Sequence, residues 1–292
     1  MKSTTTRSKL RDVRYEAAKA EYLICSKTLR QICKEHKVDK MSFSIYLNKN
    51  NVSTVKKIDS CDTTFEVIDT EDKAYWLGFL YADGAISYKE TFPTAYKVEL
   101  ALKESDKEHV EKFKLFMKSE RKIRYREKTK AVRIIISSKK LCESLIYLGC
   151  TPRKSLTLTF PNKKQVPEKL LKHFIRGYFD GDGHISINKN TNCLMVVSML
   201  GTSEFLNAVI HETKLTCSLK KDKRHLGNTF SIRPRISESI DFLNYIYKDA
   251  EIYLTRKYSK YLLAVQHRNK LNYEGAISVK GEIPNTEISQ SI

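Results

Sequence analysis

The stretch WLGFLYADGAIS at residues 76–87 is repeated, with changes, as IRGYFDGDGHIS at residues 175–186. Glycine, aspartate, glycine, isoleucine and serine recur in register, and the offset is 99 residues throughout, the difference between positions 83 and 182. Each copy is a largely apolar run that predicts a buried helix, and each run stops at an Asp-Gly pair. A repeat at this spacing indicates a duplicated domain rather than a solenoid.

The glycines and aspartates of the repeat predict a close pair of helices. Gly78 and Gly177 allow two helices to approach where they cross, although a mid-helix glycine costs about 0.5–1 kcal/mol relative to alanine. Asp83 and Asp182 fall at helix C-termini, where the helix dipole disfavours a carboxylate. Two adjacent carboxylates also repel each other, and a divalent cation would make the arrangement favourable. One copy alone would be an ordinary helix stop and turn.

The segments around the two copies follow a common plan. After the first copy, alternating strands are expected at 97–102 and 132–136, with a helix at 109–117 between them. After the second, strands are expected at 194–197 and 229–232, and a closing helix at 255–265. The sequence therefore predicts two halves and a polar tail, at residues 69–163, 164–271 and 272–292.

The N-terminal residues 1–56 predict a separate small helical segment, followed by a linker at 57–68. Residues 26–36 are expected to form a helix capped by Ser26, and residues 41–50 a second helix after a break at 38–40. This pattern is typical of a helix-turn-helix, and LRQIC at 29–33 with Val38 resembles that of resolvase-type recombinases. Any small helical hairpin would give a similar pattern. The candidate DNA contacts on the second helix are Ser42, Ser44, Asn48 and Lys49.

Composition favours a polyanionic partner. The 292 residues include 53 Lys and Arg against 34 Asp and Glu, a formal net charge of +19, and neutralising phosphates releases counterions. The basic residues recur along strands and helices, which predicts a folded domain with a basic face. No signal peptide and no run of about 20 apolar residues is present, so we expect an intracellular, soluble protein without a membrane partner. The seven cysteines lack zinc-site spacing, and we expect reduced, mostly buried thiols.

Both copies of the repeat resemble the motif of the LAGLIDADG homing endonucleases, in the single-chain, two-motif form, over roughly residues 69–268. The resemblance implies an α+β fold: a pseudo-twofold duplicated αββαββα domain with antiparallel, saddle-shaped sheets that lie in the DNA major groove. It implies a site-specific double-strand DNA endonuclease with a long asymmetric target, and we expect a monomer. It also implies Mg²⁺ or Mn²⁺ held by Asp83 and Asp182, with the backbone carbonyls of Ala82 and Gly181 as further ligands.

Several other residues match the family by position. Lys154 and Lys257 lie where the family places a basic residue late in each half. They could orient water or offset transition-state charge, and phosphate contact or plain surface charge is an equally good interpretation. Asp106, with Ser203 as its rough counterpart, lies where the family often has a polar active-site residue.

The first copy departs from the family at Tyr81, where the second copy has Asp180. That position is not a metal ligand in the family, so we expect no loss of activity. The candidate groove contacts are basic residues of both halves: Lys97, Lys103, Arg124, Arg126, Arg133, Lys189, Lys220, Arg233 and Arg235.

Two alternative functions stay open. The first is a catalytically silent transcription regulator of the same fold, although such relatives tend to lose the metal carboxylates and this chain keeps both. The second is a maturase that binds intron RNA, which no sequence feature excludes. An intein-borne endonuclease is not expected, because the chain lacks an initial splicing nucleophile and a terminal His-Asn pair.

Overall fold

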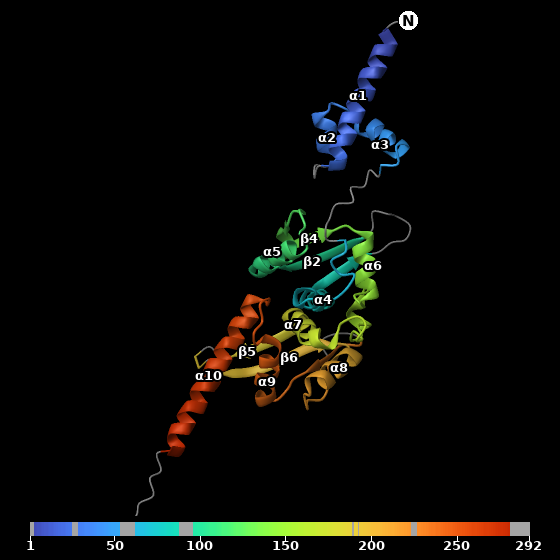
Figure 1. The fold of residues 1–292 in the computed structure, drawn as a ribbon. Coiled ribbons are helices and arrows are strands. Elements are labelled where there is room, and N and C mark those ends of the chain that lie inside the picture. The colour runs from blue at the N-terminus through green and yellow to red at the C-terminus, as the bar shows by residue number, and fades with distance from the viewer. Residues whose placement is uncertain are drawn as a thin grey trace, which may run out of the picture. The chain divides into compact units, whose positions relative to one another are not determined.

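The computed structural model describes residues 3–24, 29–52, 62–87, 96–188, 190–191, 193–222 and 227–280. The chain divides into two compact units, Met1–Asp59 and Ser60–Ile292, whose elements are labelled in Figure 1. Each unit has a hydrophobic core of its own.

The smaller unit contains α1 (Ser3–Ile24), α2 (Leu29–Glu35) and α3 (Lys40–Lys49). Its core is formed by Tyr15, Ala18, Tyr22, Ile32, Cys33, Phe43 and Leu47. The sequence predicted the second and third helices and the break between them, whereas α1 was not predicted, because its residues 3–9 are all polar. The Asp39 carboxylate caps α3 by accepting the Ser42 N–H at 2.8 Å. The expected cap Ser26 lies outside the described residues.

The larger unit repeats one order of elements twice, helix, two strands, helix, two strands, helix. The first copy is α4 (Glu71–Asp83), β1 (Gly84–Ser87), β2 (Lys97–Lys103), α5 (Lys107–Phe116), β3 (Arg124–Arg126), β4 (Ala131–Ile136) and α6 (Lys139–Tyr147). The second is α7 (Leu171–Asp182), β5 (Gly183–Ile187), β6 (Leu194–Gly201), α8 (Ser203–Thr213), β7 (Lys220–Lys221), β8 (Phe230–Ile232) and α9 (Ile236–Tyr247), followed by α10 (Thr255–Lys280). The expected duplicated αββαββα order is therefore observed.

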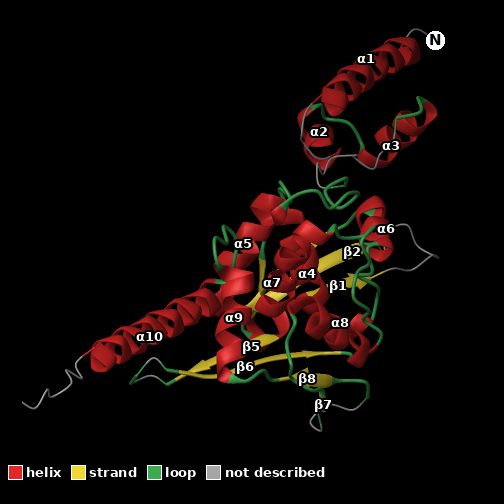
Figure 2. Ribbon diagram, turned by 60° about the horizontal axis from the view of Figure 1, so that its bottom comes forward, coloured by secondary structure: helices red, strands yellow, loops and turns green. Residues whose placement is uncertain are grey.

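Each copy forms a four-stranded antiparallel sheet, with strand orders β1-β2-β4-β3 and β5-β6-β8-β7. The helices α4 and α7 lie side by side at the centre of the unit, with one sheet on either side of the pair (Figure 2). Thr70 caps α4 by accepting the Lys73 N–H at 3.3 Å, and two carboxylates in the first turn suit the helix dipole. The two central helices are buried on nearly every side, as their apolar sequences predict.

Two expectations about the connecting segments were wrong. Phe65 and Ile68 were assigned to a linker at 57–68, but both are buried in the core of the larger unit. The tail expected from residue 272 is helical as far as Lys280, because α10 continues without a break.

Five cysteines lie in the described ranges, and all five are free thiols. Cys33, Cys142 and Cys150 are buried, whereas Cys193 and Cys217 are half-buried. Cys25 and Cys61 lie outside the described residues. No helix in the described part of the chain is both long and apolar enough to span a membrane.

Candidate active site

The helices α4 and α7 cross where the repeat places its glycines. A Cβ atom added to Gly78 would lie 2.0 Å from the carbonyl oxygen of Phe174, and one added to Gly177 would lie 1.9 Å from that of Tyr75. Neither position can hold a side chain without moving backbone, so the close approach requires glycine. The two copies of the motif therefore lie side by side where the helices cross.

The aligned helices bring their C-terminal ends together. A Cβ atom added to Gly181 would lie 2.2 Å from the Cβ of Ala82 and 3.2 Å from a carboxylate oxygen of Asp83. Gly181 directly precedes Asp182, so carboxylates 99 positions apart in the sequence share one site. Both helices stop at these aspartates and lead directly into β1 and β5.

The two carboxylates repel each other. The pKa of Asp83 is raised to about 6, first because surrounding protein displaces water and then because the Asp182 carboxylate opposes its charge. Burial likewise raises the pKa of Asp182, against the influence of Lys257, Lys154 and the Tyr178 hydroxyl. Asp83 stays accessible to solvent and Asp182 is half-buried. Solvent access leaves room for a further ligand at Asp83.

Two buried lysines cap the helix ends beside these carboxylates. The Lys257 ammonium donates to the carbonyl oxygens of Phe179, Asp180 and Gly181 at 2.6, 2.7 and 3.2 Å. Burial lowers the pKa of Lys257 to about 8, although nearby carboxylates act in the opposite direction. Lys154 donates to the carbonyl of Gly84 in the first half. Only 7% of Lys154 and 3% of Lys257 are exposed, so neither is plain surface charge.

Asp106 belongs to this charge network through an ion pair. Its two oxygens accept from Nε of Arg256 at 3.1 and 3.0 Å, which links the start of α5 to the start of α10. Arg256 in turn favours the ionised form of Asp83. The counterpart Ser203 is the first residue of α8 and is half-buried.

Tyr178 is a site residue that the sequence analysis missed. Its hydroxyl donates to the carbonyl of Leu200 at 3.0 Å and also interacts with Asp182. Its position could have indicated this role, because Tyr178 lies one helical turn before Asp182 on the same face of α7. The repeat concealed this signal, because the first copy has Phe79 at the equivalent position.

The two copies of the motif differ at Tyr81 and Asp180, and the two side chains have opposite roles in hydrogen bonding. Asp180 is fully buried and accepts from the hydroxyls of Tyr75 and Tyr247 and, at 2.7 Å, from the N–H of Leu254. Tyr81 is a donor instead, to the carbonyl of Leu148. Both side chains are buried, and Asp180 also joins the two halves, because its partner Tyr75 belongs to α4.

The donor set at the helix ends fits Mg²⁺ or Mn²⁺. Among the described residues, no three or more His, Cys, Asp and Glu side chains form a metal-binding group. Mg²⁺ usually needs only one or two carboxylates and keeps several waters, so Asp83 and Asp182 would be the residues to hold it, with the carbonyls of Ala82 and Gly181 as further candidate ligands. A bound cation would also offset the repulsion that raises the pKa of Asp83.

The outer face of the first sheet carries five of the basic residues that were predicted as groove contacts. In β2, Val98, Leu100 and Leu102 are buried, and the residues between them face outward. The strand register places the other outward positions on the same face. The basic residues on this face are Lys97, Lys103, Arg124, Arg126 and Arg133.

Within the described part of the second half, fewer of the predicted basic residues lie on the sheet. Lys220 pairs with Ser231 across β7 and β8, and Arg233 follows the end of β8. Arg235 lies beyond the sheet at the start of α9, where its N–H donates to Glu238 at 3.1 Å. Lys189 lies outside the described residues. On the small unit, Ser42, Asn48 and Lys49 are exposed and Ser44 is half-buried.

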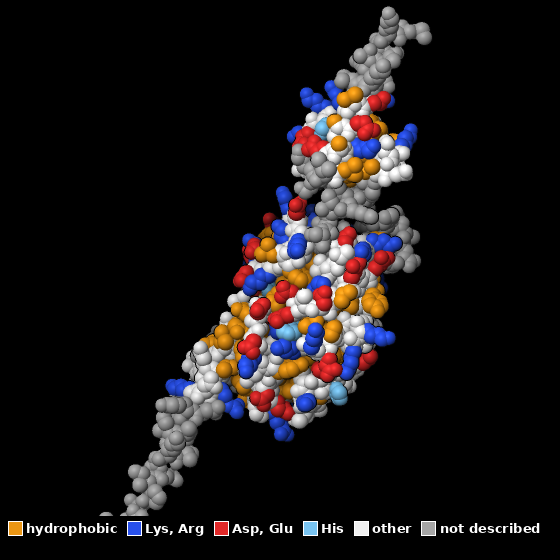
Figure 3. All heavy atoms as spheres, viewed as in Figure 1, with side chains coloured by type: hydrophobic (Ala, Val, Ile, Leu, Met, Phe, Trp, Pro, Cys, Tyr) orange, Lys and Arg blue, Asp and Glu red, His pale blue; other side chains and the backbone are white. Residues whose placement is uncertain are grey.

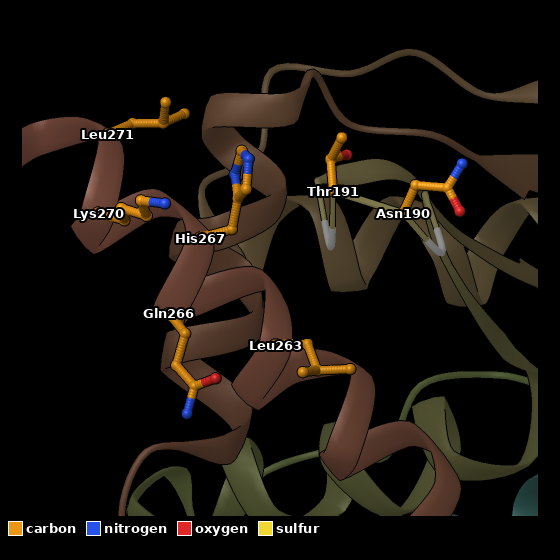
Figure 4. A pocket seen from close by; sticks show the side chains of 7 residues that line it. All are labelled: Asn190, Thr191, Leu263, Gln266, His267, Lys270 and Leu271. Atoms are coloured by element: carbon orange, nitrogen blue, oxygen red, sulfur yellow. The ribbon is translucent and has the colours of Figure 1, made fainter. Parts of the chain in front are cut away.

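A cleft of about 490 Å³ adjoins Asp182 on this second sheet. It is lined by Gly181, Asp182, Gly183, His184, Ser198, Leu200, Ser231 and Arg233. A separate hollow of about 450 Å³ lies between α10 and the turn at 190–191, and the described residues that line it include no carboxylate (Figure 4). On the face shown in Figure 3, acidic and basic side chains are mixed, so the positive excess is not gathered there.

Comparison with solved structures finds LAGLIDADG homing endonucleases. The structure of I-LtrWI bound to target DNA is 12% identical, with 77% of this chain and 99% of that chain covered and a TM-score of 0.45. I-SmaMI bound to uncleaveable DNA is 14% identical, with coverages of 71% and 94% and a TM-score of 0.43. Mesophilic variants from I-DmoI are 15% identical, with coverages of 64% and 97% and a TM-score of 0.40. No family model matches the chain, and no curated protein matches it.

The raised pKa of Asp83 predicts a pH-dependent effect on stability. Because the folded state holds this proton more tightly than the unfolded chain, ionisation of Asp83 destabilises the fold above a pH of about 6. Asp83→Asn should therefore stabilise the metal-free protein at pH 7 by about 1 kcal/mol, a value reduced for solvent access. The gain should fall between pH 6 and 4 and vanish below pH 4. Thermal unfolding across this pH range measures it.

Two controls accompany this measurement. Asp106→Asn breaks the ion pair with Arg256 and should lower the melting temperature at pH 7. Mg²⁺ should stabilise the native chain and have little effect on Asp83→Asn. An equal stability change at pH 4 and pH 7 would contradict the electrostatic explanation.

Proposed function

We propose that the chain is a site-specific double-strand DNA endonuclease that hydrolyses phosphodiester bonds with Mg²⁺ or Mn²⁺ held by Asp83 and Asp182. The proposal rests on one observation: two mutually repelling carboxylates meet where α4 and α7 end, with Gly181 packed against Asp83. A net charge of +19 and a sheet face with five basic side chains suit a DNA partner.

When bound, the metal lowers the pKa of a water nucleophile and stabilises charge on the phosphate. Lys257 and Lys154 hold the backbone carbonyls at the helix ends and place two positive charges beside the reacting phosphate. Arg256, oriented by Asp106, adds a third positive charge near Asp83. Solvent access at Asp83 admits the phosphate to this site.

The two halves would bind the two halves of a long, asymmetric target. An antiparallel sheet can place outward side chains at alternate positions against base edges in the major groove. The outward residues differ between the sheets, so the two half-sites would differ in sequence. Both carboxylates come from one chain, so the protein would act as a monomer.

Cleavage of a randomised duplex library by the full chain tests the proposal. Staggered double-strand cuts at one long sequence, formed with Mg²⁺ and absent with a chelator, would support it. Tight, salt-dependent DNA binding with no cleavage under any divalent metal would overturn the nuclease and leave a transcription regulator. Preferential binding of an intron RNA would leave a maturase.

We propose that the small unit adds affinity for DNA through α3. Asn48 and Lys49 are exposed on this helix, and Phe43 and Leu47 anchor its other face. The double change Asn48→Ala with Lys49→Ala should weaken DNA binding several-fold and reduce the salt dependence by about one phosphate contact. The cleaved phosphates should not change.

Titration of duplex binding against salt concentration measures this effect. Lys163→Ala, a change at an exposed lysine paired with Glu168, serves as a matched control. Equal binding by the α3 variant and this control would show that α3 does not contact the duplex.

A further inference from the structure

The outer face of the first sheet carries a carboxylate among its basic side chains. A single Oε1 oxygen of Glu99 accepts from Arg126 at 3.0 Å and from Arg133 at 3.3 Å. The side chains of Glu99 and Arg133 are 24% and 23% exposed, and that of Arg126 is 44% exposed. We name these three residues the Glu99 cluster.

Neither stability nor general DNA affinity accounts for the cluster. Ion pairs at a protein surface contribute about 0–1 kcal/mol, because solvent screens them and ordering two long side chains costs entropy. A carboxylate on a surface that faces phosphates also opposes binding. Its effect on the arginines is geometric, since a shared acceptor orients both guanidinium groups.

The oriented arginines keep donors for a ligand. A guanidinium has five N–H donors in a planar fork, and each arginine directs one nitrogen to Glu99. In Arg133, Nε is shielded and has no partner among the described residues, so its terminal nitrogens are the groups left to make contacts. Because the two arginines share one oxygen, their tips lie close together.

The second half has no such cluster at the matching positions. Ser198 occupies the position of Glu99 at the 99-residue offset. Arg133 faces Ala101, and the equivalent pairing in the second sheet joins Ser231 to Leu200. Hydroxyl groups therefore replace the carboxylate and the arginine, and the chemistry presented by the two sheets differs.

We infer that Arg126 and Arg133, held in place by Glu99, read the guanines of two neighbouring G·C base pairs in one half of the target. This inference rests on the proposed function. A guanidinium can donate two hydrogen bonds to O6 and N7 of guanine in the major groove. Base pairs stack about 3.4 Å apart, a step that two adjacent guanidinium groups can span. Glu99 is a positioning residue and does not contact DNA itself.

Selection of binding sites from a randomised duplex library, without divalent metal, tests the inference with the full chain. The native protein should require two neighbouring G·C pairs in one half-site. Arg126→Lys and Arg133→Lys keep the charge but lose the fork, and each should weaken the guanine preference at one of these positions by about tenfold to a hundredfold.

Glu99→Gln separates orientation from charge. It should weaken the preference at both positions, whereas its affinity for random duplex should rise because a negative charge is removed. Ser198→Ala is the matched control at the equivalent position, and it should change only the other half-site. If Glu99 only stabilised the fold, its loss would not lower the base preference and at the same time raise the affinity for random duplex.

Three results would overturn the inference. In the first, both arginine variants select the same bases as the native chain. In the second, Glu99→Gln loses affinity equally for all sequences. In the third, Glu99→Gln changes the base preference only at a third position. A native chain that cuts one specific sequence but shows any of these leaves the proposed function standing. A native chain that selects no sequence removes both proposals.

Discussion

Asp182→Asn and Asp83→Asn should each reduce the rate of double-strand cleavage by at least about a thousandfold. Asparagine keeps the size of aspartate but is neutral, so it cannot hold the cation or balance the charge of Lys257 and Lys154. Neither change should unfold the chain, because each removes a carboxylate from the unfavourable end of a helix. Single-turnover cleavage of the selected duplex, with the two strands labelled separately, measures the loss.

Two measurements serve as controls: the affinity of both variants for DNA, and the cleavage rate of a variant changed at a distant carboxylate. Both variants should bind the target at least as tightly as the native chain, since a negative charge facing phosphate is lost. Asp69→Asn, which changes an exposed carboxylate paired with Lys73, should leave the cleavage rate unchanged. Full cleavage by either site variant would show that its carboxylate holds no essential metal.

Gly177→Ala should destabilise the larger unit by about 3 kcal/mol, at the upper end of overpacking effects. The new Cβ would lie 1.9 Å from the backbone oxygen of Tyr75, and buried backbone cannot move aside as a side-chain end can. Alanine is otherwise better than glycine inside a helix by about 1 kcal/mol, so helix propensity predicts the opposite sign. A loss of stability, rather than a gain, would therefore come from the close crossing of the two helices and not from helix propensity.

Urea unfolding followed by tryptophan fluorescence measures this loss. The only tryptophan of the chain, Trp76, is buried in α4 and reports on the larger unit alone. Gly201→Ala is a milder control, because its added Cβ would meet the hydroxyl of Tyr178 at 3.0 Å. A Gly177→Ala protein as stable as the native chain would show that the helices do not cross closely.

Local pattern predicted much of the fold. The apolar runs that end in Asp-Gly predicted α4 and α7, and alternation predicted β2, β4 and β6 within a few residues. The strand register of the structure, and not the sequence, places the basic residues of the first sheet on one face, because successive side chains in a strand point to opposite sides. The pattern did not predict α1, whose residues 3–9 are all polar, or β3, whose three residues are all exposed.

The sequence by itself determined that the domain is duplicated, that its two helices carry glycines for close packing, and that each ends in an aspartate. These features are periodic or recur in register, so they can be read without coordinates. Only the tertiary structure decided which groups meet at the helix ends. The three carbonyl bonds of Lys257, the pairing of Asp106 with Arg256 and the Glu99 cluster join residues distant along the chain or on different strands. Such contacts depend on how the helices cross and the strands pair, which no local pattern encodes.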